Sequence, residues 1–143
     1  PGNIPFSQAK PFCRKAGVLL FIYFKGLHPY LLFTRRAEDM LHHRGEISFP
    51  GGGREKSEDL IQTAIREMQE ELSISPDRYS FLGALTPLYI PPSRFCMYPF
   101  AAGTSCRPDF IPESREVKEI IEIPVYHFLD NTNLQTEEWI IRG

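Results

Sequence analysis

The 143-residue sequence is poor in cysteine, in long apolar runs and in net charge, and each shortage excludes a class of protein. Its three cysteines, Cys13, Cys96 and Cys106, are an odd number without C-x-x-C spacing, so we expect reduced thiols rather than a disulfide framework or a zinc site. A formal net charge of −2 gives no electrostatic reason to expect nucleic acid or an anionic membrane as a partner. No apolar run approaches the roughly 18–20 residues of a membrane span, and no signal-peptide pattern is present, so we expect a cytoplasmic protein.

What the sequence does contain is typical of one globular domain. At 143 residues and 42% hydrophobic content the chain can bury a sizeable core, and no repeat or break in composition marks a second domain. Residues 1–15 carry three prolines and no clear period, so we interpret them as an N-terminal leader before a single domain over 16–143.

The periodicity predicts strands on both sides of one long helix. Residues 16–24 form a nearly continuous apolar, β-rich run, which is typical of a strand covered on both faces. By the same reasoning we expect further strands at 30–34, 46–49, 79–89, 95–104, 117–125 and 138–141, and a short helix at 126–130.

The stretch from residue 49 to residue 74 combines a glycine-rich turn with an amphipathic helix. Gly51, Gly52 and Gly53 follow Pro50, and glycines let a backbone turn sharply and approach a ligand closely. Ser57 is a candidate N-cap for the helix that follows. Apolar residues of that helix recur at spacings of one, three and four and form one stripe facing the core: Leu60, Ile61, Ala64, Ile65, Met68 and Leu72.

Three glutamates lie along the edge of this stripe. Glu67, Glu70 and Glu71 stand at i, i+3 and i+4, and like charges at that spacing destabilise a helix by roughly 0.2–0.5 kcal/mol per pair. A divalent cation would offset the repulsion, and carboxylate oxygens suit Mg²⁺ or Mn²⁺. Arg66 can pair with Glu70 or reach back to Glu58 and so orient a carboxylate. The alternative is a solvated acidic face of an ordinary helix.

The whole pattern resembles the Nudix box, a glycine, five residues, a glutamate, seven residues and then R-E-U-x-E-E-x-G-U. The positions that match are Gly52, Glu58, Arg66, Glu67, Met68, Glu70, Glu71 and Ile74; Ser73 stands where the motif has glycine. This resemblance implies an α/β fold in which a mixed sheet is sandwiched between helices. Nudix domains usually close with a second helix, and we expect that helix to be absent from this chain.

The resemblance also implies roles for individual residues. Glu67, Glu70 and Glu71 would bind Mg²⁺ or Mn²⁺, with the carbonyl of Gly51 completing the metal shell. Arg66 and Glu58 would pair to orient the metal ligands. Family members differ in which glutamate acts as general base, so that role stays open. Glu116 and Glu119 lie where some members place one more acidic residue near the metals, or they form a solvated strand edge.

Upstream residues resemble the extended signature of coenzyme A diphosphatases. The stretch LLFTRR, 31–36, leads through His43 and Gly45 into the F-P-G-G at 49–52. The signature usually has arginine at the position of Leu41 and often glutamine at the position of Glu46. The candidate substrate contacts are Arg35, Arg36, His43, Gly52 and Gly53, with surface or structural roles as the alternative for the first three.

We therefore expect hydrolysis of coenzyme A or an acyl derivative to 3′,5′-ADP and a 4′-phosphopantetheine product. A nucleotide sugar, a dinucleotide or a nucleoside triphosphate is the alternative substrate, and a catalytically silent nucleotide-binding Nudix domain is the alternative from another class. The expected partner is this small nucleotide substrate, with no nucleic acid or membrane. The oligomeric state stays open, with a homodimer among the options.

Overall fold

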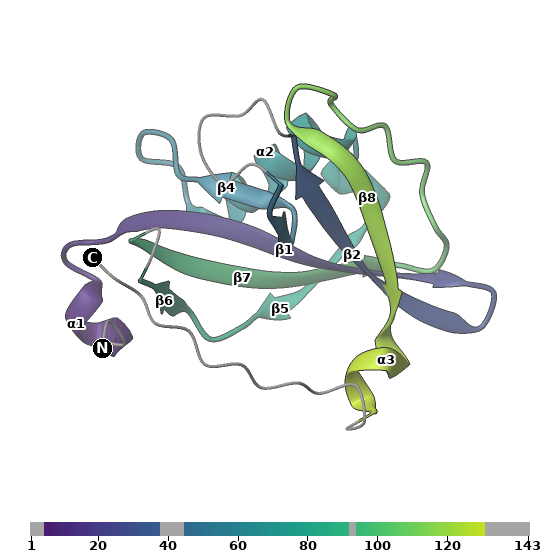
Figure 1. Cartoon of the computed structure of the whole chain (residues 1–143), viewed down its shortest axis with the longest axis horizontal. Coiled ribbons are helices and arrows are strands. Elements are labelled where there is room, and N and C mark those ends of the chain that lie inside the picture. Colours follow the sequence, from purple (N-terminus) through teal and green to yellow (C-terminus); the bar gives the residue numbers. More distant parts are fainter. Residues whose placement is uncertain (1–4, 38–44, 92–93, 131–143) are drawn as a thin grey trace.

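The computed structural model describes residues 5–37, 45–91 and 94–130, which form one mixed sheet and a few helices (Figure 1). The strands are β1 Arg14–Lys25, β2 His28–Arg36, β3 Ile47–Ser48, β4 Gly51–Gly53, β5 Ser80–Ala84, β6 Leu88–Ile90, β7 Phe95–Thr104 and β8 Val117–Pro124. The helices are α1 Phe6–Ala9, α2 Leu60–Leu72, a short 3₁₀ helix Pro76–Arg78 and α3 Val125–Leu129. In the described part of the chain, no helix is both long and apolar enough to cross a membrane.

Strand β1 is the centre of the sheet. It runs parallel to β7 along one edge, and on its other edge it pairs antiparallel first with β4 and then with β2. The strand order is β3-β2-β1-β7-β5, with β8 also on β2 and β6 also on β7. The glycine-rich strand β4 is thereby fixed against β1, directly ahead of the helix that carries the glutamates.

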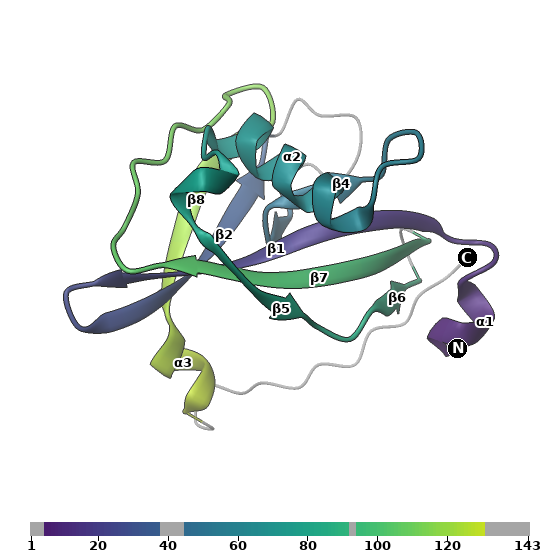
Figure 2. The same ribbon diagram turned by 180° about the vertical axis from the view of Figure 1, so that it is seen from behind.

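The core lies between this sheet and α2, which crosses one face of it (Figure 2). Alternate residues of β1, Leu19, Phe21 and Tyr23, point to this face and are completely buried. From α2 the buried partners include Met68 and Leu72. Because burying one large apolar side chain contributes roughly 1.5–3 kcal/mol, this packing, rather than helix propensity, holds α2 in place. The mixed sheet with packed helices confirms the predicted fold class.

The N-terminal end of α2 differs from the prediction, whereas its C-terminal end has the backbone conformation that the motif's glycine implies. Ser57 is not the N-cap; Asp59 is, and its backbone N–H donates to Gln62 Oε1 at 2.9 Å. The helix begins later than predicted because the preceding Glu58 turns back and accepts a hydrogen bond from the N–H of Glu55. At the other end Ser73 adopts the left-handed conformation, with φ 60°, which a glycine adopts at lower cost.

Most predicted strands are confirmed, as is the short helix, which is α3. The predicted strand at 79–89 is wrong as a single element. It divides into β5 and β6, which both pair with β7 and are separated by residues 85–87; the register of β5 on β7 also shifts between Phe81 and Gly83. Within the predicted leader, α1 is helical and β1 begins at Arg14. The predicted strand at 138–141 and the question of a closing helix lie outside the described residues.

The expectation of reduced thiols is wrong for Cys13 and Cys96, which form a disulfide with a Cα–Cα distance of 5.6 Å. The parallel register of β1 and β7 sets Lys15 opposite Cys96 and so brings the start of β1 beside it. An odd cysteine count says nothing about a pair that only tertiary structure brings together. Cys106 is free and exposed, as predicted.

Candidate functional site

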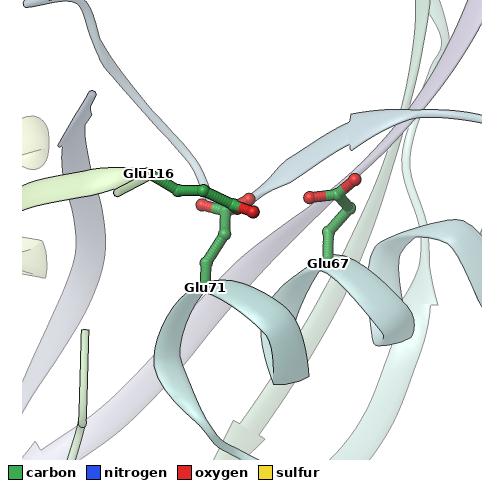
Figure 3. Close-up of side chains that lie close together, drawn as sticks. All are labelled: Glu67, Glu71 and Glu116. Atoms are coloured by element: carbon green, nitrogen blue, oxygen red, sulfur yellow. The ribbon is translucent and has the colours of Figure 1, made fainter. Parts of the chain in front are cut away.

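Three carboxylates converge at one end of α2 (Figure 3). Glu67 and Glu71 come from successive turns of the helix, and Glu116 reaches them from the residue before β8. One oxygen of each lies within 4.8 Å of the others. The backbone of Glu116 is held here because its carbonyl accepts a hydrogen bond from Ala37 N–H, just past the end of β2, at 3.0 Å.

The glycines of β4 make room for these carboxylates. The N–H of Gly51 donates to Glu71 Oε1 at 3.1 Å. A Cβ on Gly51 would lie 2.5 Å from the carbonyl oxygen of Gly17 in β1, and a Cβ on Gly52 would lie 2.5 Å from Glu67 Oε1. Only glycine allows the loop to pack this closely against both β1 and the helix.

Arg66 ties the glycine loop to the acidic helix face. Its Nη2 donates to Glu58 Oε1 at 2.9 Å and to the Gly53 carbonyl at 3.1 Å. Its Nη1 donates to Glu67 Oε1 and to Glu70 Oε2, both at 3.1 Å. The sequence left open whether Arg66 pairs with Glu70 or with Glu58, and it pairs with both. The side chain of Glu70 is 48% exposed and lies outside the three-carboxylate cluster.

Burial and mutual repulsion dominate the electrostatics of the cluster. Burial, reinforced by the charge of Glu67, raises the pKa of Glu71 from its ordinary value of 4.5 to about 9. Burial also raises the pKa of Glu67, although Arg66 opposes the change. In contrast, the hydrogen bond from Arg66 lowers the pKa of Glu58 to about 2. Two neighbouring carboxyl groups, one buried and one partly buried, that resist ionising together suit a divalent cation, and their hard oxygen atoms match Mg²⁺ or Mn²⁺.

The residues predicted to contact the substrate do not share one environment. The guanidinium of Arg35 is hydrogen-bonded to Glu119 and to the carbonyl of Gly45. The Nε of Arg36 is buried and has no hydrogen-bond partner among the described residues. Gly52 and Gly53 lie in β4, and His43 lies outside the described residues. Of the two additional acidic candidates, only Glu116 joins the cluster.

Sequence reasoning missed two residues that support Glu58 and Arg66. The hydroxyl of Thr63 donates to Glu58 Oε1 at 3.0 Å, and Glu55 Oε1 lies 3.5 Å from Arg66 Nη1. Thr63 is completely buried, and a polar residue among the apolar positions of the helix was the available signal. Glu55 precedes the helix, and no spacing rule pointed to it.

Comparisons with known proteins identify a family and several similar proteins. A family model described as "NUDIX domain" matches residues 14–140. The chain is 40% identical over 98 residues to "Uncharacterized Nudix hydrolase NudL" of Pectobacterium atrosepticum, covering 68% of this chain and 50% of that protein. It is 33% identical over 127 residues to the human "Mitochondrial coenzyme A diphosphatase NUDT8", covering 86% of this chain and 49% of that protein. The chain thus spans about half the length of these curated relatives.

Solved structures share the fold at low sequence identity. The Nudix hydrolase RenU of M. Smegmatis superposes with a TM-score of 0.68 at 19% identity, covering 81% of this chain and 73% of that one. A C. elegans Ap4A hydrolase superposes with a TM-score of 0.66 at 18% identity, covering 81% of this chain and 83% of that one. At these identities the likeness concerns the architecture of sheet and helix.

Proposed function

Because this chain belongs to the Nudix family, we propose that it is a Mg²⁺- or Mn²⁺-dependent hydrolase that cleaves a diphosphate linkage. The observation that carries the proposal is the convergence of Glu67, Glu71 and Glu116 beside the glycine loop. Such a cluster is costly to keep ionised in a buried position unless a cation neutralises it. A structural role for three converging carboxyl groups, of which Glu71 is buried, would not need the close approach of Gly52 to Glu67.

The cation would be held by Glu67, Glu70 and Glu71, with the carbonyl of Gly51 as a further ligand. Glu116 is the carboxylate from outside the helix that supplements this set. Arg66 fixes the rotamers of Glu67 and Glu70 through its two Nη1 hydrogen bonds, and ligands held in this way bind metal more tightly.

The reaction is hydrolysis, in which a water oxygen attacks one phosphorus and the bond from that phosphorus to the bridging oxygen breaks. The chemistry that a bound divalent cation supplies is neutralisation of phosphate charge and a lower pKa of a bound water. One of the glutamate carboxylates accepts the proton of the attacking water. The N–H groups and small size of the glycine loop let the diphosphate approach the backbone.

The proposed substrate is coenzyme A or an acyl derivative, cleaved to 3′,5′-ADP and a 4′-phosphopantetheine product. Support comes from the LLFTRR and H-x-G-x-x-x-F-P-G-G stretches and from the similarity to a relative named as a coenzyme A diphosphatase. Arg36 is the better candidate of the two arginines for binding phosphate oxygens, because Arg35 already contacts Glu119 and Gly45. Gly52, Gly53 and His43 complete the proposed substrate contacts.

The test is product analysis after incubation with Mg²⁺ or Mn²⁺ and a panel of coenzyme A, ADP-ribose, a nucleotide sugar, a dinucleoside polyphosphate and a nucleoside triphosphate. We expect 3′,5′-ADP to appear fastest and all turnover to stop when EDTA removes the metal. Faster cleavage of another compound would refute the coenzyme A assignment and point to Leu41 and Glu46 as marks of a changed pocket. No turnover of any compound would refute the hydrolase and favour a silent binding domain.

A further inference from the structure

The disulfide joins two segments that meet beside the glycine loop. Cys13 stands just before β1, and Cys96 is the second residue of β7. We propose that this pair is a reversible redox-modification site that controls how firmly the glycine loop is held. Its effect on turnover rests on the hydrolase function proposed above, whereas its effect on the loop does not.

Phe95 connects the disulfide to the loop. It is adjacent to Cys96, and the guanidinium carbon of Arg14 lies 4.5 Å from the centroid of its ring. The edge of the same ring lies near Gly53, where an added Cβ would lie 3.6 Å from Phe95 Cε1 and 3.8 Å from Phe95 Cζ. The ring therefore packs against the end of β4 while the disulfide anchors its backbone.

Gly53 is in turn part of the site. Its carbonyl accepts the hydrogen bond of Arg66 Nη2 at 3.1 Å, and the same guanidinium positions Glu67. The next residue, Arg54, donates its backbone N–H to the Lys15 carbonyl of β1 at 2.8 Å. An unbroken series of contacts thus runs from the sulfur atoms through Phe95 and Gly53 to Arg66.

The two sulfur atoms differ in accessibility, and this difference decides which of them an external thiol attacks. Cys96 is completely buried, whereas Cys13 is only partly buried and its Sγ makes an exposed contact with the Lys10 carbonyl at 3.7 Å. A thiolate of an external dithiol can attack Cys13 Sγ, which breaks the S–S bond and releases Cys96 as a thiolate that takes up a proton. The second thiol of the reagent then displaces Cys13, so two electrons and two protons reduce the pair while the dithiol becomes a disulfide. Oxidation by a small disulfide reverses both steps.

Reduction removes the covalent link at the end of the β1–β7 ladder, where Arg14 pairs with Phe95. Without it the end of β7 keeps its backbone pairing with β1 and β6 and the cation–π contact of Phe95 but loses its covalent tie to Cys13, so Phe95 leaves Gly53 more often. We expect the oxidised protein to be the form with the better ordered loop.

The experiment compares the protein oxidised with glutathione disulfide and reduced with dithiothreitol. Mass spectrometry of peptides establishes the Cys13–Cys96 link, and hydrogen exchange reports on residues 51–54. On reduction we expect exchange at Arg54 to become about tenfold faster. We also expect kcat to fall roughly three- to tenfold with less change in KM, because Arg66 acts on the metal ligands rather than on substrate affinity. Reoxidation should restore both.

Three variants make the test specific. Cys13→Ser should behave as the reduced protein under all conditions, and Cys106→Ser should respond as the wild type does, since Cys106 is free and exposed. Phe95→Ala should show fast exchange in both redox states. The proposal is overturned if the oxidised protein lacks the link, if exchange at 51–54 ignores reduction, or if Phe95→Ala keeps the redox response. If neither form cleaves a diphosphate, the proposed function fails and the exchange data alone decide this proposal.

Discussion

Replacing Glu71 by glutamine should inactivate the protein and at the same time make its metal-free form more stable. Only 5% of this residue is exposed, and its folded-state pKa is raised from 4.5 to about 9 by burial and by the neighbouring charge of Glu67. At pH 7 the folded protein must therefore hold a proton that the unfolded chain releases. Each pH unit above the ordinary pKa costs about 1.4 kcal/mol, so the total cost at pH 7 is about 3–4 kcal/mol.

Glutamine avoids this cost because it is neutral at every pH. Its Oε1 can still accept the hydrogen bond from Gly51 N–H, and its NH₂ group can donate to the carboxylate of Glu67. We expect Glu71→Gln to raise the free energy of unfolding of the metal-free protein at pH 7 by about 2–3 kcal/mol. The gain should vanish near pH 4.5, where Glu71 is protonated in both folded and unfolded states, and grow toward pH 9.

The assay is urea unfolding in EDTA at a series of pH values. Glu70→Gln is the matched control, because its side chain is half exposed and its replacement should change stability by no more than about 0.5 kcal/mol. Both variants should lose hydrolysis, since both residues are proposed metal ligands. A Glu71→Gln protein that is no more stable than the wild type at pH 7, or a gain that does not depend on pH, would refute the electrostatic reasoning.

Three further predictions concern the surroundings of the cluster. Gly52→Ala should lower turnover by up to about 100-fold, because the new Cβ would lie 2.5 Å from Glu67 Oε1 and displace that carboxylate. Circular dichroism should show that the fold is retained, and turnover close to wild type would contradict the contact. Arg66→Lys should weaken Mn²⁺ binding, measured by calorimetry, by roughly 10–100-fold, because a lysine cannot hydrogen-bond to Glu58 and Glu67 at the same time. Unchanged affinity would show that Arg66 does not position the metal ligands. Glu116→Gln should weaken Mn²⁺ binding about tenfold, and an affinity equal to wild type would place Glu116 outside the metal site.

Local patterns predicted the helix and its acidic edge well. The spacing of Glu67, Glu70 and Glu71 was sufficient to place all three along one side of α2. The spacing could not tell which of the three glutamates would be buried, because burial depends on the residues that pack against each side chain. Glu71 faces Gly51 and is buried, while Glu70 turns to solvent and to Arg66.

Features that depend on strand register could not be predicted from the sequence. From the sequence, Glu116 and Glu119 were equivalent candidates for the additional acidic residue. The pairing of β8 with β2, which is irregular between Arg35 and Arg36, decides between them. It places Glu116 in the cluster and Glu119 opposite Arg35, which donates a hydrogen bond to it. The disulfide likewise follows from the parallel pairing of β1 with β7. No local pattern around either cysteine specifies that pairing, since the two strands are distant in the sequence.

The most direct test of the proposed chemistry is the rate of diphosphate hydrolysis in Mg²⁺ by wild type and by Glu67→Gln, measured on the best substrate of the panel. Glu67 belongs to the converging cluster and is the glutamate that Arg66 and Gly52 both contact. We predict that the wild type turns over and that the folded variant is at least about 100-fold slower. Equal rates for the two proteins would contradict a metal-dependent active site at this end of α2.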